Sequence, residues 1–503
     1  MSRLCLSLME NTLEKDLAVL NQYRQYINLA ELRVDCLDAN ERLLLRRFPE
    51  MAGVPVILTV RRECDGGKYI GGEGHRITFL ARGLAFAELD PRKNFAYIDI
   101  EEDVSVPGLE EAARSFGTRI IRSIHCLDTD CLQGDAESIA LAFEKRMRAL
   151  LRQGDEIPHL LMRPQNMNDC LVVYKVAEKI KDFDKIIDCS GFFGMNTRVL
   201  SDKLVSFVTY SSTHNAEELS PKQLVEDYRF GNLNKNTDIY ALIGYPLRQS
   251  LTPAVINKGF SELGINAVYL PFPVVSLDNF FELSNELKIK AVSVTAPYKE
   301  KILPYLSEKS DAVQKVGACN TMLKTEEGWV GYNTDTMGFM DSISAFTGRK
   351  NLKGMKVTVL GAGGIARSVA SCLYDMRARV LILNRSDIRA HKISRPYGFA
   401  SAGLDSQGME LMERHRDLII QCTSLGMNNE AEDALPDYNF TGKELVMDLI
   451  YTPKKTNFLK RAEEAGCKVS NGLSVLYAQA AHQFNIFTQA DLPTHIKNDF
   501  FEK

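Results

Sequence analysis

The chain has 503 residues and a formal net charge of −4, and 45% of its residues are hydrophobic. This composition is ordinary for a globular protein, so it favours neither a nucleic-acid partner nor a membrane surface. No apolar run approaches the roughly 20 residues of a membrane helix. The start, MSRLCLSLMENTLEKD, lacks a signal peptide's long apolar core, so we expect a cytoplasmic protein. The length predicts roughly two to four domains, and the 11 scattered cysteines favour reduced thiols.

Short β-rich runs alternate with helical stretches over residues 1–232. This alternation predicts a (β/α)₈ barrel, the first part of an α/β chain. The predicted helices include Ile77–Leu89, Ala136–Gln153 and Asp169–Lys181. The predicted strands are Leu4–Leu8, Leu29–Val34, Val56–Val60, Tyr97–Ile100, Arg119–His125, His159–Met162, Ile186–Cys189 and Val205–Thr209.

Charged residues gather at the carboxyl ends of these strands, where barrels carry their active sites. Glu31, Arg33 and Asp35 alternate in AELRVD and so point to one side of a strand. Arg61 closes the third strand and His125 closes the fifth. The pattern favours a site for an anionic substrate. The alternative is a buried structural ion pair with a solvated histidine.

Seven ordered segments of this half resemble type I 3-dehydroquinate dehydratase. They are SLM from Ser7, ELRVD from Glu31, TVR with the following GG, SIH from Ser123, EIPHLLMRPQ from Glu156, Arg198 and SPKQ from Ser220. The resemblance implies that His125 shuttles a proton. It also implies a set of substrate-binding residues, namely Ser7, Glu31, Arg33, Arg61, Arg198 and Gln223.

One residue departs from this family at its central chemical step. The family's Schiff-base lysine follows the IP of the sixth strand, where this chain has His159. An imidazole cannot form an imine with a ketone, so the usual electron sink is missing. Lys68, in a glycine-rich loop, is either another source of an amine or a solvated surface lysine. The barrel is therefore either a dehydratase or a binding and scaffolding module.

Polar residues in GNLNKNTD, residues 231–238, mark a boundary before the second half. A strand at Tyr240–Ile243 is followed by Ser250 and Thr252, ahead of a predicted helix. These hydroxyls either bind an anion at the helix start or simply cap the helix. Further on, Thr295 and Lys299 follow another predicted strand, with Asn320 and Asp335 later in the chain.

VTVLGAGGIA, residues 357–366, has the pattern of a strand, a glycine turn and a helix that binds a dinucleotide. The next strand, Arg379–Leu383, ends in Asn384-Arg385-Ser386, where an NAD site usually has an acidic residue. An arginine there suits a 2′-phosphate, so the sequence favours NADP. The alternative is an ordinary surface arginine.

Nine ordered motifs make residues 237–487 resemble shikimate dehydrogenase. They are SLTP, VTAPYK, GACNT, NTDTMG, GAGG, NRS, TSLGM, DLIYTPKKT and GLSVLYAQAA. The resemblance implies that Lys299 and Asp335 form the catalytic pair. It implies that the substrate is held by Ser250, Thr252, Thr295, Asn320, Tyr451 and Gln479. It places NADP along Gly361, Ala362, Gly363, Gly364, Ile365, Asn384, Arg385, Ser386, Arg389, Thr423, Leu449 and Gly472.

These resemblances together predict an N-terminal barrel, residues 1–232, followed by a two-lobed dehydrogenase. Residues 237–340, completed by 474–503, would form the substrate lobe, and residues 341–473 a Rossmann-type NADP lobe. The chain would then dehydrate 3-dehydroquinate and reduce the resulting 3-dehydroshikimate to shikimate, with small molecules as its only predicted partners. Two alternatives remain, a dehydrogenase with an inactive barrel and a reductase that also accepts quinate.

Overall fold

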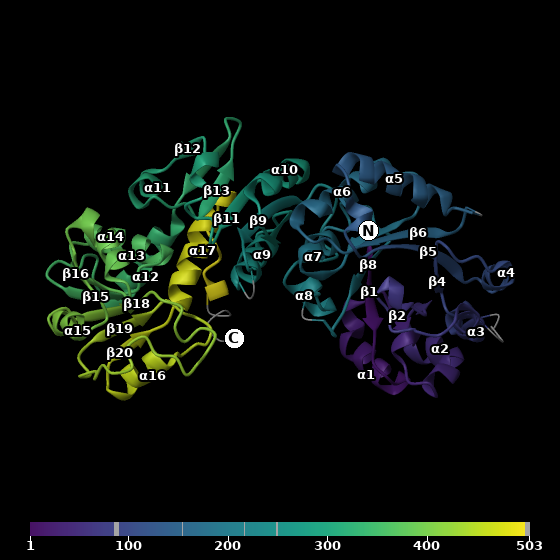
Figure 1. Cartoon of the computed structure of the whole chain (residues 1–503), viewed down its shortest axis with the longest axis horizontal. Coiled ribbons are helices and arrows are strands. Elements are labelled where there is room, and N and C mark those ends of the chain that lie inside the picture. The colour runs from purple at the N-terminus through teal and green to yellow at the C-terminus, as the bar shows by residue number, and fades with distance from the viewer. Residues whose placement is uncertain (85–89, 153, 216, 248–249, 498–503) are drawn as a thin grey trace. The chain divides into compact units, whose positions relative to one another are not determined.

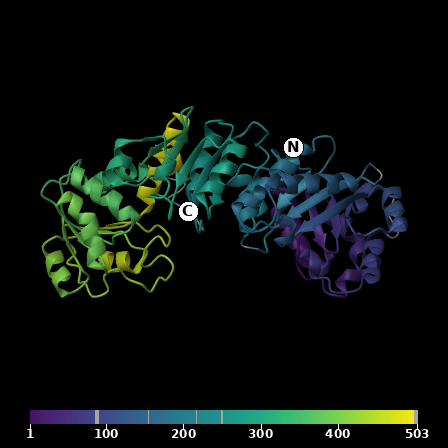
Figure 2. The ribbon, with the colours of Figure 1, turned by 45° about the horizontal axis from the view of Figure 1, so that its top comes forward.

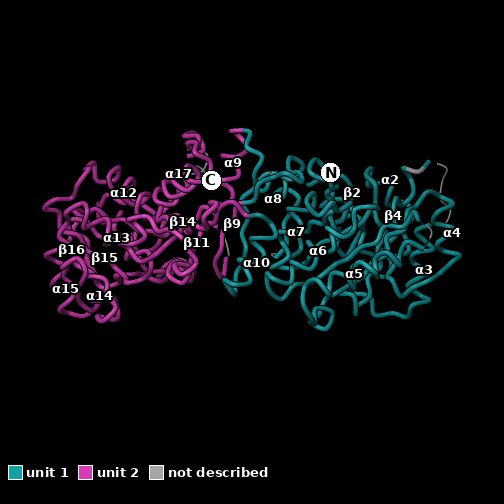
Figure 3. Tube along the Cα trace, turned by 90° about the horizontal axis from the view of Figure 1, so that it is seen from above, with its two compact units in different colours: residues 1–239, 264–288 teal, residues 240–263, 289–503 magenta. Residues whose placement is uncertain are grey.

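The computed structural model describes residues 1–84, 90–152, 154–215, 217–247 and 250–497 (Figure 1). Its chain divides into two compact units, shown in different colours in Figure 3. The first contains residues 1–239 and 264–288, and the second contains residues 240–263 and 289–503.

The first unit is built on eight parallel strands in the order β7-β6-β5-β4-β3-β2-β1-β8. Strands β7 and β8, at the two ends of this order, contact each other, which nearly closes the barrel. The strands are β1 (Arg3–Leu8), β2 (Leu29–Arg33), β3 (Val56–Thr59), β4 (Tyr97–Glu101), β5 (Arg119–Cys126), β6 (Ile157–Met162), β7 (Ile186–Cys189) and β8 (Val208–Ser211). The predicted (β/α)₈ barrel is confirmed.

Helices follow the barrel strands and lie around them (Figure 2). They are α1 (Leu13–Tyr23), α2 (Phe48–Ala52), α3 (Glu73–Leu84), α4 (Pro107–Ser115), α5 (Ala136–Ala149), α6 (Cys170–Lys179), α7 (Gly191–Val199) and α8 (Pro221–Glu226). The unit also contains β10 (Ala267–Pro273) and α10 (Leu277–Leu287). Every barrel strand contributes a buried side chain to one core cluster, which fills the barrel with packed side chains.

Some predicted boundaries differ from those observed. Helix α3 begins four residues before the predicted Ile77, and the predicted end at residues 85–89 lies outside the described residues. The predicted end of the α5 segment at Gln153 also lies outside them. Strand β8 begins at Val208 rather than Val205, because Val205 has a left-handed backbone with φ 51° that cannot belong to a strand. Cys126 and Cys131 form a disulfide, so the expectation that all thiols are reduced was wrong for this pair.

The second unit begins with strands in the order β9-β11-β13-β14-β12, of which β9 and β11 are parallel. They are β9 (Asp238–Gly244), β11 (Ala291–Val294), β12 (Glu308–Lys309), β13 (Thr321–Lys324) and β14 (Trp329–Tyr332). Helices α9 (Thr252–Glu262), α11 (Asp311–Val316) and α12 (Thr334–Thr347) follow them. The last helix, α17 (Leu473–Thr488), packs against α9, α12 and β13. Residues 498–503, at the end of the predicted substrate lobe, lie outside the described residues.

A second sheet in this unit has six parallel strands in the order β17-β16-β15-β18-β19-β20. They are β15 (Lys356–Leu360), β16 (Arg379–Leu383), β17 (Ala400–Ala402), β18 (Leu418–Gln421), β19 (Leu445–Asp448) and β20 (Lys468–Ser470). Its helices are α13 (Gly364–Asp375), α14 (Asp387–Ser394), α15 (Ser406–Glu413) and α16 (Asn457–Glu464). This is the strand order of a Rossmann fold, which places a ligand where the order reverses, at the carboxyl ends of β15 and β18.

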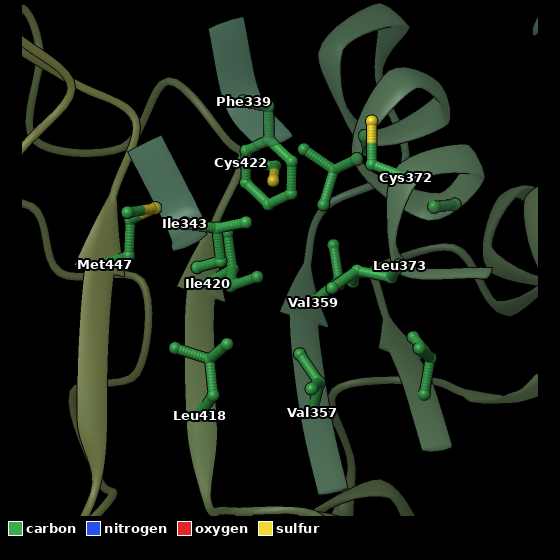
Figure 4. Close-up of a cluster of buried hydrophobic side chains, with 14 of the residues drawn as sticks. Phe339, Ile343, Val357, Val359, Cys372, Leu373, Leu418, Ile420, Cys422 and Met447 are labelled. Carbon is green, nitrogen blue, oxygen red and sulfur yellow. The ribbon is translucent and has the colours of Figure 1, made fainter. Parts of the chain in front are cut away.

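In the hydrophobic core of this lobe, the sheet packs against α12 and α13. Val359 and Ile420 of the central strands face Phe339 and Ile343 of α12, with Leu373 of α13 beside them (Figure 4). All five side chains are fully buried. Helix α12 therefore belongs to the core of the lobe while its first turn remains available for chemistry.

Candidate active sites

A lysine and an aspartate lie in direct contact in the second unit. Lys299 follows β11, and its Nζ lies 2.6 Å from Oδ2 of Asp335. Asp335 occupies the first turn of α12, where Asn333 caps the helix by accepting the N–H of Thr336 at 3.2 Å. Unpaired amide groups at a helix start favour a negative charge. The carboxylate is buried, whereas 22% of the lysine side chain is exposed, so the amine can reach a ligand.

Asn320 fixes the other oxygen of this carboxylate. Its Nδ2 donates to Oδ1 of Asp335 at 2.9 Å, and its Oδ1 accepts the N–H of Thr334 at 2.7 Å. The amide therefore holds Asp335 in one orientation and leaves Oδ2 for Lys299. A lysine held beside a buried carboxylate is suited to general acid and base catalysis.

Three more of the residues predicted to bind substrate lie at the same edge of the sheet. Because β9 and β11 are parallel, Ser250 and Thr252 after β9 share this edge with Thr295 after β11. Gly244, at the end of β9, lies so close that an added Cβ would be 2.4 Å from Cγ2 of Thr295. Ser250 Oγ accepts a hydrogen bond from the N–H of Thr252 at a long 3.4 Å. This is a weak version of the helix capping that the sequence offered as an alternative to anion binding.

Gln479 and Tyr451 complete the predicted substrate set. Gln479 of α17 lies against α12 at Gly338, where an added Cβ would be 2.6 Å from the Gln479 backbone nitrogen. Gly338 is one turn after Asp335, so Gln479 is near the pair. Tyr451 follows β19, and burial raises the pKa of its hydroxyl. Among the described residues, no hydrogen bond joins Tyr451 to the other predicted site residues.

Gln483 was not predicted, yet it connects α17 to the sheet. Its Oε1 accepts from Ser293 Oγ at 3.0 Å, and its Nε2 donates to Thr321 Oγ1 at 3.0 Å. The residue lies one turn after Gln479 on the same helix face. That spacing was the available signal in the sequence.

The predicted cofactor residues lie at the point where the Rossmann strand order reverses. Gly361 follows β15 with φ 107°, and an added Cβ would lie 2.9 Å from Thr423, which follows β18. Gly363 and Gly364 open α13, and an added Cβ would meet nothing within 4 Å of either. Ala362 and Ile365 pack against the core. The helix start is therefore open on the side where a pyrophosphate would sit.

The other predicted cofactor residues are arranged around the same sheet edge. Asn384 follows β16 and donates to the carbonyl of Ser386 at 2.9 Å, which shapes the turn that presents exposed Arg385. Arg389 is also exposed, on α14. At Gly472, an added Cβ would lie 2.1 Å from the carbonyl oxygen of Leu449. Open glycine backbone and two exposed guanidinium groups fit a dinucleotide with a 2′-phosphate.

The barrel contains a cavity of about 470 Å³ at the carboxyl ends of its strands. Its lining includes Lys68 and five of the six predicted substrate residues, namely Ser7, Glu31, Arg33, Arg61 and Arg198. Four buried atoms of the lining have no hydrogen-bond partner among the described residues, namely Arg61 Nε, Asp188 Oδ2, Arg198 Nη1 and Tyr210 OH. Of these, Arg198 Nη1 lies 3.2 Å from Glu218 Oε2 in an ion pair. Leaving a buried polar group unsatisfied costs about 1–3 kcal/mol, so these atoms indicate a polar ligand.

His125 lies behind the cavity wall, between Arg61 and Asp65. Arg61 Nη1 contacts its Nε2, and its Nδ1 lies 3.1 Å from Oδ1 of Asp65. A guanidinium only donates, so the ring accepts at Nε2 and carries its proton at Nδ1. Burial, followed by the Arg61 charge, lowers the pKa of His125 to about 4, against the hydrogen bond to Asp65. His125 is therefore a neutral base near pH 7.

His159 lines the cavity at the centre of the barrel, and only 2% of its side chain is exposed. Its Nε2 lies 3.4 Å from Asp188 Oδ1, its Nδ1 lies 3.4 Å from Ser123 Oγ, and its ring stacks on Tyr210 at 5.4 Å. Both ring nitrogens thus have partners. Burial raises the pKa of the Asp188 carboxyl, but the hydrogen bond with His159 and the charge of Arg198 together have the larger effect, so the pKa is lowered.

Arg33 and Gln223 have structural partners in this state. Arg33 forms two hydrogen bonds with Asp35, at 3.0 and 2.9 Å, which is the ion pair considered as an alternative. Gln223 does not line the cavity. It accepts from the backbone and hydroxyl of Ser220 at 3.0 Å each, in a capping box at the start of α8.

The described residues contain neither a cluster suited to a metal ion nor a helix suited to a membrane. No group of three or more His, Cys, Asp or Glu residues suited to a metal ion is present in the described ranges. Within those same ranges, no helix has the length and apolar character needed to cross a membrane.

Comparison with known proteins identifies three matched regions. Residues 4–230 match the family model of type I 3-dehydroquinase. Residues 242–322 match the shikimate dehydrogenase substrate binding domain, and residues 344–447 match shikimate / quinate 5-dehydrogenase.

Relatives cover both halves. The shikimate dehydrogenase (NADP(+)) of Pyrococcus furiosus is 35% identical over 257 residues, 51% of this chain and 92% of that protein. The chloroplastic bifunctional 3-dehydroquinate dehydratase/shikimate dehydrogenase of Arabidopsis thaliana is 25% identical over 526 residues, 98% of this chain and 83% of that protein. The crystal structure of shikimate dehydrogenase from Aquifex aeolicus is 31% identical, covers 54% of this chain and 100% of its own, and has a TM-score of 0.49. The chain therefore belongs to the shikimate dehydrogenase family and carries an N-terminal domain of the type I 3-dehydroquinase family.

Proposed function

We propose that this chain is a shikimate-pathway enzyme that reduces 3-dehydroshikimate to shikimate with NADPH. The observation that carries the proposal is the contact between Lys299 and Asp335, 2.6 Å apart and oriented by Asn320. The relatives named shikimate dehydrogenase (NADP(+)) support the same reaction and cofactor.

Reduction of the substrate ketone requires a proton at the ketone oxygen. Bound NADPH supplies the hydride that goes to the ketone carbon. Lys299 donates a proton from Nζ to the ketone oxygen as negative charge develops there, and Asp335 stabilises the ammonium group before that transfer. Ser250, Thr252, Thr295, Asn320, Tyr451 and Gln479 bind the carboxylate and hydroxyls of the substrate.

NADPH is held at the edge of the Rossmann sheet. The backbone from Gly361 to Ile365, at the start of α13, would hold the pyrophosphate. Arg385 and Arg389 bind the 2′-phosphate, with Asn384 and Ser386 shaping their turn. Thr423, Leu449 and Gly472 border the nicotinamide half. Residues 341–473 form this lobe, and residues 237–340 with 474–503 form the substrate lobe.

The barrel, residues 1–232, dehydrates 3-dehydroquinate to 3-dehydroshikimate. The unsatisfied polar atoms of its cavity favour this function because they call for a polar ligand. His125 takes and returns a proton, and the substrate is bound by Ser7, Glu31, Arg33, Arg61, Arg198 and Gln223. Of these, Arg33 and Gln223 must first leave their present partners. The enclosure of His159 favours the alternative, a barrel that binds without imine chemistry.

One coupled assay tests both activities. Purified protein receives NADPH with either 3-dehydroquinate or 3-dehydroshikimate, and loss of NADPH absorbance is followed. Consumption with both substrates supports two active halves. Consumption with 3-dehydroshikimate alone leaves the dehydrogenase and refutes the dehydratase, and consumption with neither refutes both.

Two variants sharpen this assay. A His125→Gln variant should lose only the response to 3-dehydroquinate. His159→Lys restores an amine at the barrel centre, and a gain with 3-dehydroquinate would show that the cavity still positions that substrate. Comparing quinate with shikimate in the reverse direction, with NADP⁺, decides whether quinate is also a substrate. We further propose a cytoplasmic location, although the plant relative is named as chloroplastic.

A further inference from the structure

A second hollow, of about 740 Å³, lies on the Rossmann lobe away from the predicted cofactor residues. Its lining includes the first residues of β16 and β17 and the end of α13. The glycine turn after β15 lies at the opposite ends of these parallel strands. Five residues of strand span about 16 Å, so the hollow is separate from the proposed NADPH site. Its volume falls within the range of about 300–1,000 Å³ of small-molecule sites.

Three aromatic rings form one wall of this hollow. Tyr374, Tyr397 and Phe399 contact one another, with ring centroids 5.3, 5.5 and 6.2 Å apart. Tyr374 is 50% exposed, and Lys315 Nζ lies 5.5 Å from the centroid of its ring. The wall therefore presents apolar ring surface to solvent.

Two guanidinium groups lie beside these rings. Arg377 and Arg379 line the hollow and are exposed. Neither guanidinium has a hydrogen bond or an ion pair with another described residue. The carboxylate in the described lining, Asp375, is already paired with Lys315. The hollow therefore has unpaired positive charge.

The backbone of Arg377 adds an independent observation. It follows α13 with φ 61°, in the left-handed conformation that glycine usually supplies at a helix end. A residue with a Cβ pays about 1 kcal/mol or more there. This position turns the chain directly from the end of α13 into β16 and keeps a guanidinium group next to the rings.

We propose that this hollow binds a small aromatic carboxylate. The ring of the ligand lies against Tyr374 and Tyr397, and its carboxylate is bound by Arg377 and Arg379. Aromatic faces stack on a planar ring, and a guanidinium pairs with a carboxylate through two parallel hydrogen bonds. Two positive charges exclude a cationic ligand, and the rings distinguish this site from a plain anion site.

Isothermal titration calorimetry of the full chain with 4-hydroxybenzoate tests the proposal. The titration is run with NADP⁺ and 3-dehydroshikimate present in excess, so that the dehydrogenase site is occupied by a pair that cannot exchange a hydride. We expect binding that persists under these conditions. The affinity should fall at least tenfold in Arg377→Gln and in Arg379→Gln, and should not change in Arg349→Gln, which alters an exposed arginine outside the hollow. NADPH oxidation with 3-dehydroshikimate verifies that each variant is folded.

Three results would each overturn the proposal. The first is the absence of binding, and the second is displacement of the probe by 3-dehydroshikimate, which would assign it to the dehydrogenase site. The third is equal affinity in the wild type and the two hollow variants. Acetate serves as a probe without a ring, and acetate binding as tightly as 4-hydroxybenzoate would also contradict the role of the aromatic wall.

Discussion

Replacing Lys299 with alanine separates its chemical role from its structural one. General acid catalysis contributes about 10²–10⁴-fold to a rate, so kcat should fall by that factor, or about 3–5 kcal/mol in the barrier. The structural effect should be smaller. Asp335 loses the hydrogen bond to Nζ, worth about 1.5–3 kcal/mol for a charged group, and exposure of 22% of the lysine side chain reduces this value. Asn320 still donates to the other carboxylate oxygen.

The measurement is NADPH oxidation with 3-dehydroshikimate, with the thermal midpoint recorded for each variant. Lys301→Ala is the matched control, because Lys301 lies in the same segment and its Nζ lies over the Tyr298 ring, 5.8 Å from the centroid. We expect normal kcat in this control. A kcat within fivefold of the wild type in Lys299→Ala would remove Lys299 from proton transfer. A loss that follows the fall in thermal midpoint would assign it a structural role only.

Three other perturbations address the cofactor, the barrel and the packing of α17. Arg385→Asp should raise the KM for NADPH at least tenfold and leave the KM for NADH unchanged, because it places a negative charge beside the 2′-phosphate. An unchanged preference for NADPH over NADH would mean that other residues bind that phosphate. In the folded chain the pKa of His125 is about 4, below its usual 6.5. Between these two pH values the unfolded chain binds a proton at His125 that the folded chain does not. The free energy of unfolding therefore falls as the pH drops from about 6.5 to about 4, by up to about 3 kcal/mol. Urea unfolding at several pH values should show a smaller fall in His125→Gln, and an identical fall in both proteins would refute this source. Gly338→Ala should lower the free energy of unfolding by about 1–3 kcal/mol, because its Cβ would lie 2.6 Å from the Gln479 backbone. The control Gly364→Ala, whose Cβ would have nothing within 4 Å, should unfold at the same midpoint as the wild type. Equal stability of the two variants would contradict the close approach of α12 and α17.

The sequence predicts the fold well where the pattern of residues is local. Barrel strands and the Rossmann strand-turn-helix have strong periodicity and glycine turns, and both folds are observed. Boundaries are less certain when one residue adopts an unusual backbone. Val205 is β-branched and favours a strand, yet it lies in a turn in which its N–H donates to the Asp202 carbonyl at 3.2 Å. Its φ of 51° ends this turn and delays the start of β8 by three residues.

Pairings between distant residues are harder to predict. Lys299 and Asp335 are 36 residues apart, and the resemblance to a family, rather than spacing, suggested their contact. The one-turn spacing from Gln479 places Gln483 on the same face of α17, but it does not indicate the contact with Ser293, 190 residues away. The interaction of Gln223 with Ser220 is local, but a capping box and a ligand-binding glutamine have the same sequence pattern. The two roles of the glutamine differ only in the conformation of its side chain.

The position of α17 also affects how the chain is made. The hydroxyl of Tyr240 bonds to the carbonyl of Phe487, 247 residues later, and Gln483 closes the network below Asn320. Ribosomes add about 5–20 residues per second, so β9 emerges roughly 12–50 s before its partner exists. During that interval the apolar face destined for α17 is exposed on the nascent chain. Folding helpers that shield apolar surface should therefore act on this region, while the eight barrel strands, which all precede β9, can pair before α17 exists.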